Sequence, residues 1–399
     1  MYKNTNSQKD RCFYNSSILG MLVLFVMLLN SDAIAQSTVR SETKRPKKGN
    51  LIFQYQNPIS SGIDKHGLRD CQIVKDGDYW YMTGTAYPHW ERQETDGNYN
   101  RGVPLYRSKD ILNWEFVKYI VEAGGPDTWY HRRFWAPEIH KIGKKYYATF
   151  NCNNPNLGYL GQHTGYAVAD HIEGPYSIVT KEKPLSGGND LTFFADTDGK
   201  VWAFWNAGRT FGIGYAQIDL STGTFLTQPT TAIQSGRVDY AYDQNGNLLK
   251  VSDRNGRLVP KVARYRDWDA IGIEGACVIK EKDTYYLFYS SWSRGYEIGY
   301  ATAKSITGPW EKNEGNPFYG AQNKTTCKEN GFEWQGNPEN PFRGVGHNQI
   351  FKGPDGRYWL SCHGVAKERP PLLVIDPIWF DDNGNVQSNG PTYTLQSIY

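Results

Sequence analysis

Five residues that are able to carry acid–base or metal chemistry each stand at or near the start of an apolar, strand-like segment. They are four carboxylic acids and one histidine: Asp70, Glu138, Asp190, Glu274 and His347. Each acid alone is also an ordinary residue for a turn or a strand end. If the strands surround one axis, however, all five side chains converge at one mouth, where buried charges are costly without partners or a function.

Two carboxyl groups at one mouth suit hydrolysis by general acid–base catalysis. An inverting hydrolysis of a glycosidic bond needs one ionised and one protonated carboxyl group, roughly 6.5–9.5 Å apart, so that a water molecule fits between base and sugar. A neighbouring anion helps to keep the acid protonated near neutral pH. A lone histidine is not a metal site by its spacing, and a hydrogen-bonded core histidine is one interpretation of His347.

The segments that position these residues repeat loosely along the chain. Each unit has a polar or acidic start, an apolar strand, a turn with Gly or Asp, a Tyr- and Trp-rich strand and a weaker third strand. The first strands lie near 69–74, 135–140, 189–194, 273–278 and 346–351. Five units that can each form a four-stranded antiparallel sheet predict an all-β, five-bladed β-propeller. A β-sandwich built of hairpins explains the turns but not the fivefold recurrence.

Two longer polar stretches interrupt this repeat. The stretch 236–269 carries Asn245-Gly246 and Asn255-Gly256, which are hairpin-turn signals, and it predicts an inserted hairpin or loop rather than a separate domain. The stretch 313–343 is rich in Asn, Gly and Pro and predicts a surface loop.

The first residues have the pattern of a secretory signal peptide, predicted over 1–35. Lys3, Lys9 and Arg11 precede an apolar run at 18–29, and small residues follow at 33–35. The alternative is an uncleaved membrane anchor. We predict a linker or strand at 36–56, with a basic run at 44–48, and a catalytic domain at 57–399. The protein is therefore predicted to be secreted or periplasmic, with no membrane segment after signal removal.

Composition narrows the partners. The formal net charge is only +3, with no tail of like charges, which argues against a nucleic-acid partner. The chain has Tyr 28, Phe 17 and Trp 13, residues that suit short strands and stacking on sugar rings. After removal of the signal peptide the remaining cysteines include no C-x-x-C pair. This spacing favours buried small hydrophobic residues over a zinc site or a disulfide framework, with one disulfide left open.

The segments around the five residues resemble glycoside hydrolase family 43, from about Asn57 to the C-terminus. The resemblance is carried by five segments in order: Leu68-Arg69-Asp70, Phe134-Trp135-Ala136-Pro137-Glu138, Asp190 before Phe193-Phe194, Ile273-Glu274-Gly275-Ala276 and Gly346-His347-Asn348. Cys71 and Leu191 stand where the family commonly has proline. These departures bear on the substrate subgroup more than on the catalytic plan.

The resemblance implies a role for each residue. Asp70 matches the general base that activates water, Glu274 the general acid, and Asp190 the third carboxylate, which orients the acid and raises its pKa. Trp135 is the candidate for the wall of the −1 sugar pocket, unless it packs between blades. Glu138 is given a supporting or substrate-contact role, with a structural ion pair as the alternative.

His347 resembles an axial histidine that, in many relatives, faces a water-coordinated ion, commonly calcium, in the central channel. The resemblance therefore implies a structural calcium ion there as one interpretation of His347 and no cofactor for the chemistry itself.

Together these features predict an exported glycoside hydrolase whose partner is an oligosaccharide or polysaccharide. It would cleave terminal α-L-arabinofuranosyl, β-D-xylosyl or related units from plant or algal glycans with inversion. One alternative is a retaining fructan-type hydrolase, but the Asn-Asp-Pro and Arg-Asp-Pro segments of those enzymes are not present as such. The other is a non-catalytic carbohydrate-binding propeller, which would be expected to lose at least one of Asp70, Asp190 and Glu274.

Overall fold

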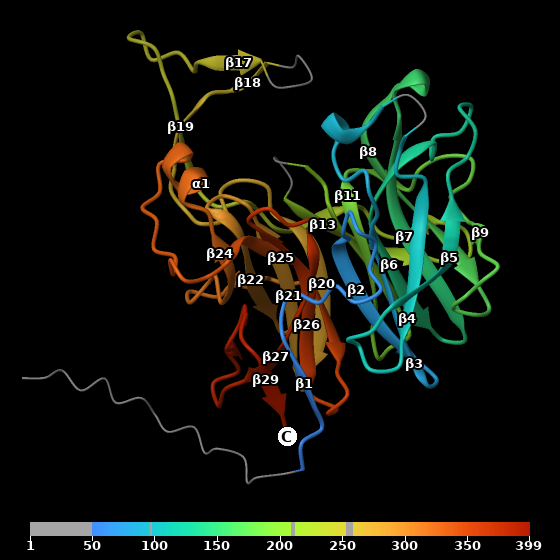
Figure 1. Cartoon of the computed structure of the whole chain (residues 1–399). Helices are drawn as coiled ribbons and strands as arrows, with labels where there is room; N and C mark the ends of the chain where they lie inside the picture. Colours follow the sequence, from blue (N-terminus) through green and yellow to red (C-terminus); the bar gives the residue numbers. More distant parts are fainter. Residues whose placement is uncertain (1–49, 96–97, 209–211, 253–257) are drawn as a thin grey trace, which may run out of the picture. The chain divides into compact units, whose positions relative to one another are not determined.

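The computed structural model describes residues 50–95, 98–208, 212–252 and 258–399 (Figure 1). The signal peptide predicted at 1–35 and the basic run at 44–48 lie outside the described residues. The described helices are short: η1 (Glu91–Gln93), η2 (Pro155–Leu157) and α1 (Lys324–Glu329). Within the described ranges, no helix is both long and apolar enough to cross a membrane.

Five antiparallel sheets, called blades 1 to 5 here, follow one another along the chain. Blade 1 consists of β2 (Arg69–Asp76), β3 (Tyr79–Thr85), β4 (Gly102–Ser108) and β5 (Glu115–Glu122). Blade 2 consists of β6 (Arg132–Ile142), β7 (Lys145–Asn154) and β8 (Tyr159–Ala169), with the short strands β9 (Ser177–Ile178) and β10 (Ser186–Gly187). Blade 3 consists of β11 (Asn189–Ala195), β12 (Val201–Asn206) and β13 (Ile213–Asp219), with β14 (Thr224–Phe225) and β15 (Thr230–Ile233).

The last two blades follow the same plan. Blade 4 consists of β20 (Glu274–Glu281), β21 (Thr284–Ser291) and β22 (Gly295–Ala303), with β23 (Glu311–Lys312) and β24 (Tyr319–Gln322). Blade 5 consists of β25 (Phe342–Lys352), β26 (Tyr358–Ala366), β27 (Leu372–Phe380) and β28 (Val386–Ser388). Each blade begins at one of the five units that the sequence predicts.

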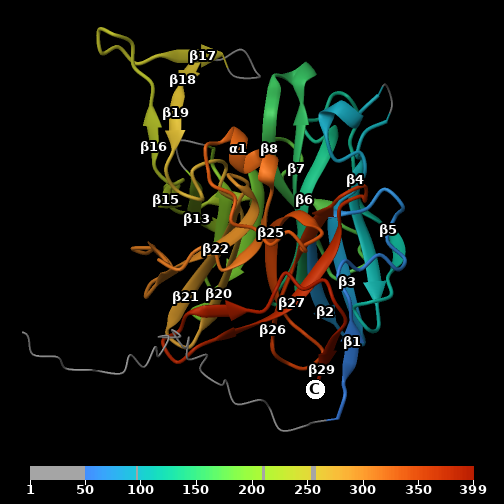
Figure 2. The ribbon, with the colours of Figure 1, turned by 60° about the vertical axis from the view of Figure 1, so that its left-hand side comes forward.

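The first strand of each blade contacts the first strands of both neighbouring blades. The contacts run from β2 to β6, β11, β20 and β25, and β25 contacts β2 again. These five strands therefore surround one axis, as Figures 1 and 2 show. The predicted all-β, five-bladed β-propeller is confirmed.

Residues from both ends of the described chain join blade 1 to blade 5. The strand β1 (Phe53–Tyr55) pairs with β29 (Gln396–Ile398). The N–H groups of Ile59 and Leu68 donate to the carbonyl oxygens of Leu373 and Pro371 at 2.8 and 2.9 Å. The ring is thus closed by backbone hydrogen bonds between segments that are far apart in sequence.

The hydrophobic core lies between the blades, in five clusters, one for each pair of neighbours. Between blades 1 and 5, for example, Trp80 and Met82 pack with Trp359 and Ile375. Fully burying one large apolar side chain contributes about 1.5–3 kcal/mol. This packing explains the aromatic composition and holds the starts of the first strands in fixed positions around the axis.

The two polar stretches form more regular structure than simple loops. In the insert, β16 (Val238–Tyr240) pairs with β19 (Val262–Tyr265), and β17 (Lys250–Ser252) pairs with β18 (Leu258–Pro260). The stretch 313–343, predicted as a surface loop, contains β24, which pairs with β22, and α1. Both elements are short, with four residues in β24 and six in α1, so the polar composition around them gave no sequence pattern.

Five cysteines fall in the described ranges, and all are buried and unbonded to one another. They are Cys71, Cys152, Cys277, Cys327 and Cys362. They pack as small side chains, which is the role that their spacing favours.

Candidate active site

The site is built on an irregularity that recurs near the start of the first strand of every blade. At this point the pairing with the second strand shifts register. The backbone there is left-handed, with φ of 55° at Asp70, 41° at Ala136, 60° at Asp190, 63° at Gly275 and 60° at His347. Such β-bulges turn side chains away from the regular alternation of a strand. Asp70, Asp190 and His347 are thereby brought to one place.

A cavity of about 790 Å³ lies where these bulges converge. Five of the predicted site residues line it: Asp70, Trp135, Asp190, Glu274 and His347. The wall is completed by residues from strands and loops of several blades, including Arg69, Thr85, His89, Trp90, Leu160, His163, Asn206, Gly272 and Trp292.

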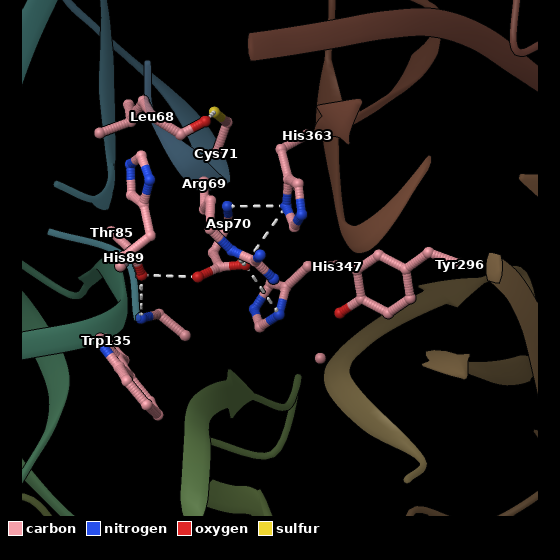
Figure 3. Close-up of polar contacts among 12 residues, drawn as sticks. Leu68, Arg69, Asp70, Cys71, Thr85, His89, Trp135, Tyr296, His347 and His363 are labelled. Carbon is pink, nitrogen blue, oxygen red and sulfur yellow. Dashed lines mark hydrogen bonds and ion pairs between the residues drawn. The ribbon is translucent and has the colours of Figure 1, made fainter. Parts of the chain in front are cut away.

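Asp70 is held by several polar groups from blades 1 and 5 (Figure 3). The hydroxyl of Thr85 donates to Oδ2 of Asp70 at 2.5 Å, and the same hydroxyl oxygen accepts the N–H of Ala136 at 2.7 Å. Nδ1 of His347 lies 3.4 Å from Oδ1 of Asp70, and Nε of Arg69 lies 4.0 Å from that oxygen. The carboxylate is therefore fixed on both of its oxygen atoms.

His363 binds the backbone of the same residue. Its Nδ1 accepts the N–H of Asp70 at 3.0 Å, so the proton of the neutral ring is on Nε2. Burial, followed by the nearby charge of Arg69, lowers the pKa of His363 to about 4, which keeps the ring neutral at ordinary pH.

The pKa of Asp70 lies well below its ordinary value. Burial alone would raise this pKa, but the charge of His347, followed by that of Arg69, outweighs it. Burial alone would lower the pKa of His347, but the negative charges of Asp70 and Asp190 raise it above its ordinary value. Asp70 is therefore ionised at neutral pH, as a base that activates water must be.

Glu274 has the opposite electrostatic environment. Burial, followed by the negative charge of Asp190, raises its pKa to about 7. The hydroxyl of Tyr296 donates to Oε1 of Glu274 at 2.6 Å, which leaves Oε2 to carry the acidic proton. A carboxyl group with a pKa near 7 can donate a proton near neutral pH.

Asp190 lies beside Glu274. Its Oδ2 accepts the N–H of Gly275 at 3.0 Å, and its Oδ1 lies 3.4 Å from the donor Nδ2 of Asn151. Burial raises the pKa of Asp190, against the lowering effect of His347. Glycine suits position 275 because its φ is positive and because an added Cβ would lie 3.3 Å from Cα of His347.

The donors near His347 do not form a good calcium site by themselves. Asp190, Glu274 and His347 place ligand atoms within 4.8 Å of one another. Calcium prefers six to eight oxygen ligands, whereas this group offers two carboxylates and a nitrogen. A cation bound directly by Glu274 would also displace its proton. Nε2 of His347 is buried without a hydrogen-bond partner among the described residues, and a calcium ion held there through water stays a prediction.

Glu138 lies elsewhere. It is 1% exposed and is not among the described residues that line the cavity. Its Oε2 is 2.9 Å from Nε2 of His140, and its Oε1 accepts from Nε2 of Gln349 at 2.5 Å. Glu138 follows the left-handed Ala136 by two residues, so it lies farther along β6 than a bulge residue. These contacts support the structural ion pair, one of its two predicted roles.

Three contributors to the site had no recognisable sequence signal. Thr85, Tyr296 and His363 lie on second or third strands, and each acts through a hydrogen bond to a residue on another strand. Tyr296 is one of 28 tyrosines, and neither its neighbours nor its position in a unit distinguishes it. Only the register between strands and blades identifies these residues.

The fold and the site together define a β-propeller hydrolase in whose cavity one carboxyl group has a lowered pKa and another has a raised pKa. The model of the glycosyl hydrolases family 43 matches residues 55–386. The chain belongs to this family, and the predicted family is confirmed.

Two curated relatives illustrate the similarity. A non-reducing end alpha-L-arabinofuranosidase from Bacteroides ovatus is 23% identical over 78% of this chain and 48% of its own length. An extracellular endo-alpha-(1->5)-L-arabinanase from Bacillus subtilis is 23% identical over 82% of this chain and 91% of its own length. This chain therefore spans about half of the first relative but most of the second.

Solved structures agree on the fold. A thermostable family-43 glycoside hydrolase superposes with a TM-score of 0.61 at 22% identity, over 85% of this chain and 97% of that one. A xylan beta-1,4-xylosidase from Bacillus halodurans superposes with a TM-score of 0.60 at 18% identity, over 86% of this chain and 59% of that one.

Proposed function

We propose that the chain is an exported glycoside hydrolase that removes terminal α-L-arabinofuranosyl, β-D-xylosyl or related units from plant or algal glycans with inversion. Family membership supports the reaction class. The names of the relatives support the substrate class, since they include an arabinofuranosidase, arabinanases and xylosidases.

The observation that carries the proposal is the opposite protonation of two carboxyl groups in one cavity. Asp70 has a pKa well below its ordinary range, and Glu274 has a pKa of about 7. Hydrolysis of a glycosidic bond needs such a pair, because one group takes a proton from water while the other gives one to the departing oxygen.

In the proposed reaction, Asp70 accepts a proton from a water molecule that attacks the anomeric carbon. Oε2 of Glu274 donates its proton to the glycosidic oxygen as the bond to the leaving sugar breaks. The negative charge of Asp190 keeps that proton on Glu274 until the transition state. Release of the sugar and exchange of protons with solvent return Asp70 to its ionised form and Glu274 to its protonated form.

Aromatic side chains at the cavity are candidates for sugar contacts. Trp135 lines the cavity beside Thr85, as Figure 3 shows, and is the proposed wall of the pocket for the cleaved sugar. Trp90 and Trp292 line the same cavity and are 37% and 46% exposed, so each offers ring surface to neighbouring sugar units, although the guanidinium of Arg69 covers part of the Trp90 ring at 3.8 Å.

Time-resolved proton NMR on an active substrate tests the stereochemistry. We expect the first-formed sugar to have the anomeric configuration opposite to that of the substrate, because a base that works through water stands back from the anomeric carbon. A retained anomer, or a trapped glycosyl ester of Asp70, would refute inversion and favour the fructan-type alternative.

A panel of nitrophenyl glycosides, arabinan and xylan tests the substrate and the mode of attack. Release of single sugars from chain ends is expected, whereas oligosaccharides released from linear arabinan would show endo action instead. Absence of turnover on every glycoside, with binding retained, would favour the non-catalytic alternative. The proposed export rests on the predicted signal peptide, and N-terminal sequencing of the protein from the medium or periplasm tests it.

A further inference from the structure

The left-handed residues of the five bulges are matched by a second repeating feature. In each blade, one residue of the second strand pairs with the residue just before the bulge. These partners are Thr85, Asn151, Asn206, Ser290 and His363, opposite Arg69, Trp135, Asn189, Glu274 and Gly346. All five partners are polar, although their neighbours on the second strands are mostly apolar.

Three of these polar side chains accept the N–H of the bulge residue in the following blade. Thr85 of blade 1 accepts the N–H of Ala136 at 2.7 Å, and Ser290 of blade 4 accepts that of His347 at 2.9 Å. His363 of blade 5 accepts that of Asp70 at 3.0 Å. The same contact therefore recurs with three different residue types.

The other two positions do not repeat this contact. Nδ2 of Asn151 in blade 2 lies 3.4 Å from the carboxylate of the next bulge residue, Asp190. Oδ1 of Asn206 in blade 3 accepts the N–H of Gly208 instead. The bulge residue that follows Asn206 is Gly275, the one residue type that adopts a left-handed backbone without strain. Each bulge residue with a side chain is thus contacted by the polar residue of the preceding blade, through its N–H at Asp70, Ala136 and His347 and through its carboxylate at Asp190.

We propose that His363 is the positioning residue for Asp70. By accepting the N–H of Asp70 on Nδ1, it holds the left-handed backbone that directs the carboxylate toward Thr85 and His347. This inference rests on the proposed function for the role of Asp70, but the contact itself belongs to the fold. An error of about 1 Å in the position of a catalytic group can cost about 10²-fold in rate.

Two substitutions distinguish the effect of the hydrogen-bond acceptor of His363 from the effect of its side-chain volume. His363→Asn keeps an acceptor near the position of Nδ1, because Oδ1 of Asn lies the same number of bonds from the backbone as Nδ1 of His. His363→Leu removes the acceptor but stays apolar and buried. We expect His363→Leu to lose about 10- to 10²-fold in kcat with KM nearly unchanged, and His363→Asn to stay within about fivefold of the wild type.

Ser361→Ala is the matched control. The hydroxyl of Ser361, on the same strand, donates to the carbonyl oxygen of Cys71 at 2.9 Å, another hydrogen bond between blades 5 and 1 that does not involve Asp70. Its kcat should equal that of the wild type. If His363→Leu does not fold, His363→Gln replaces it, because its amide lies one carbon farther out and should also lose rate.

The leaving group identifies the step that is affected. The loss in His363→Leu should be similar for substrates with good and poor leaving groups, since the base acts on water. Equal losses in the Asn and Leu variants, a kcat of His363→Leu within twofold of the wild type, or rescue by a good leaving group would each overturn the proposal.

Crystal structures of both variants test the contact independently of activity. The backbone φ of Asp70 should leave the left-handed region in His363→Leu and keep it in His363→Asn. An unchanged backbone at Asp70 in His363→Leu would overturn the proposal, whether or not the wild type hydrolyses a glycoside. Absence of glycoside hydrolysis by the wild type would by itself reject only the proposed function.

Discussion

The two sides of the cavity are both built from first strands, but they surround their carboxyl groups with opposite charges. On the side of blades 1 and 5, Asp70 lies among Thr85, His347, His363 and Arg69, and its pKa is low. On the side of blades 3 and 4, Glu274 lies beside Asp190, and its pKa is about 7. Both carboxyl groups come from first strands. The difference teaches that a place on a first strand does not by itself decide the pKa of a carboxyl group, and that the neighbouring charges do.

Removing either carboxyl group tests the comparison most severely. Asp70→Asn and Glu274→Gln should each reduce kcat by about 10²–10⁴-fold, because each removes one proton transfer. A substrate with a very good leaving group should partly restore Glu274→Gln but not Asp70→Asn, since only the acid assists departure. Steady-state kinetics on a matched pair of substrates measures this. Similar rescue of both variants would contradict the assigned roles.

Asp190→Asn should make the pKa values of the carboxyl groups on the two sides of the cavity more similar. The negative charge of Asp190 raises the pKa of Glu274, so its removal lowers that pKa. The acid then loses its proton at a lower pH, and the basic limb of the kcat profile should move below its wild-type position near 7. The rate at neutral pH should fall several-fold, because a smaller fraction of Glu274 then carries its proton. An unmoved basic limb would exclude Asp190 from this role.

Tyr296→Phe should shift the same limb slightly in the opposite direction. The hydroxyl of Tyr296 donates to Glu274, and this hydrogen bond lowers the pKa of the acid. Without it the carboxyl group keeps its proton to a higher pH, and we expect a change in kcat of only a few-fold. Comparison of the pH profiles of Tyr296→Phe and Asp190→Asn provides the check, because shifts in the same direction would show that charge and hydrogen bonding do not oppose each other here.

The sequence predicted the fold because the recurring strands leave a strong pattern. Aromatic residues and turn residues repeat five times, and each repeat is a blade. It also indicated that Asp70, Asp190 and Glu274 converge, since the starts of first strands meet at one end of a propeller.

What the sequence could not give was the exact place of each acid relative to its bulge. Asp70 and Asp190 are bulge residues, Glu274 precedes a bulge, and Glu138 follows one by two residues. When a residue other than glycine has a left-handed backbone, its residue type does not reveal that conformation. For this reason Glu138 could not be distinguished from the other acids in the sequence. His363 could not be found there either, because its contact depends on how two blades pack together.

The closure of the ring has a consequence for the timing of activity. Asp70 and His363 are 293 residues apart, and β1 pairs with β29 only when the last strand has formed. Synthesis proceeds from the N-terminus at about 5–20 residues per second, so the nascent chain carries its base for some time before blade 5 exists. During that interval the proposed base lacks both of its blade 5 neighbours, His347 and His363. Maturation of the catalytic centre thus coincides with the last step of assembly, and a truncated product of translation is expected to be inert.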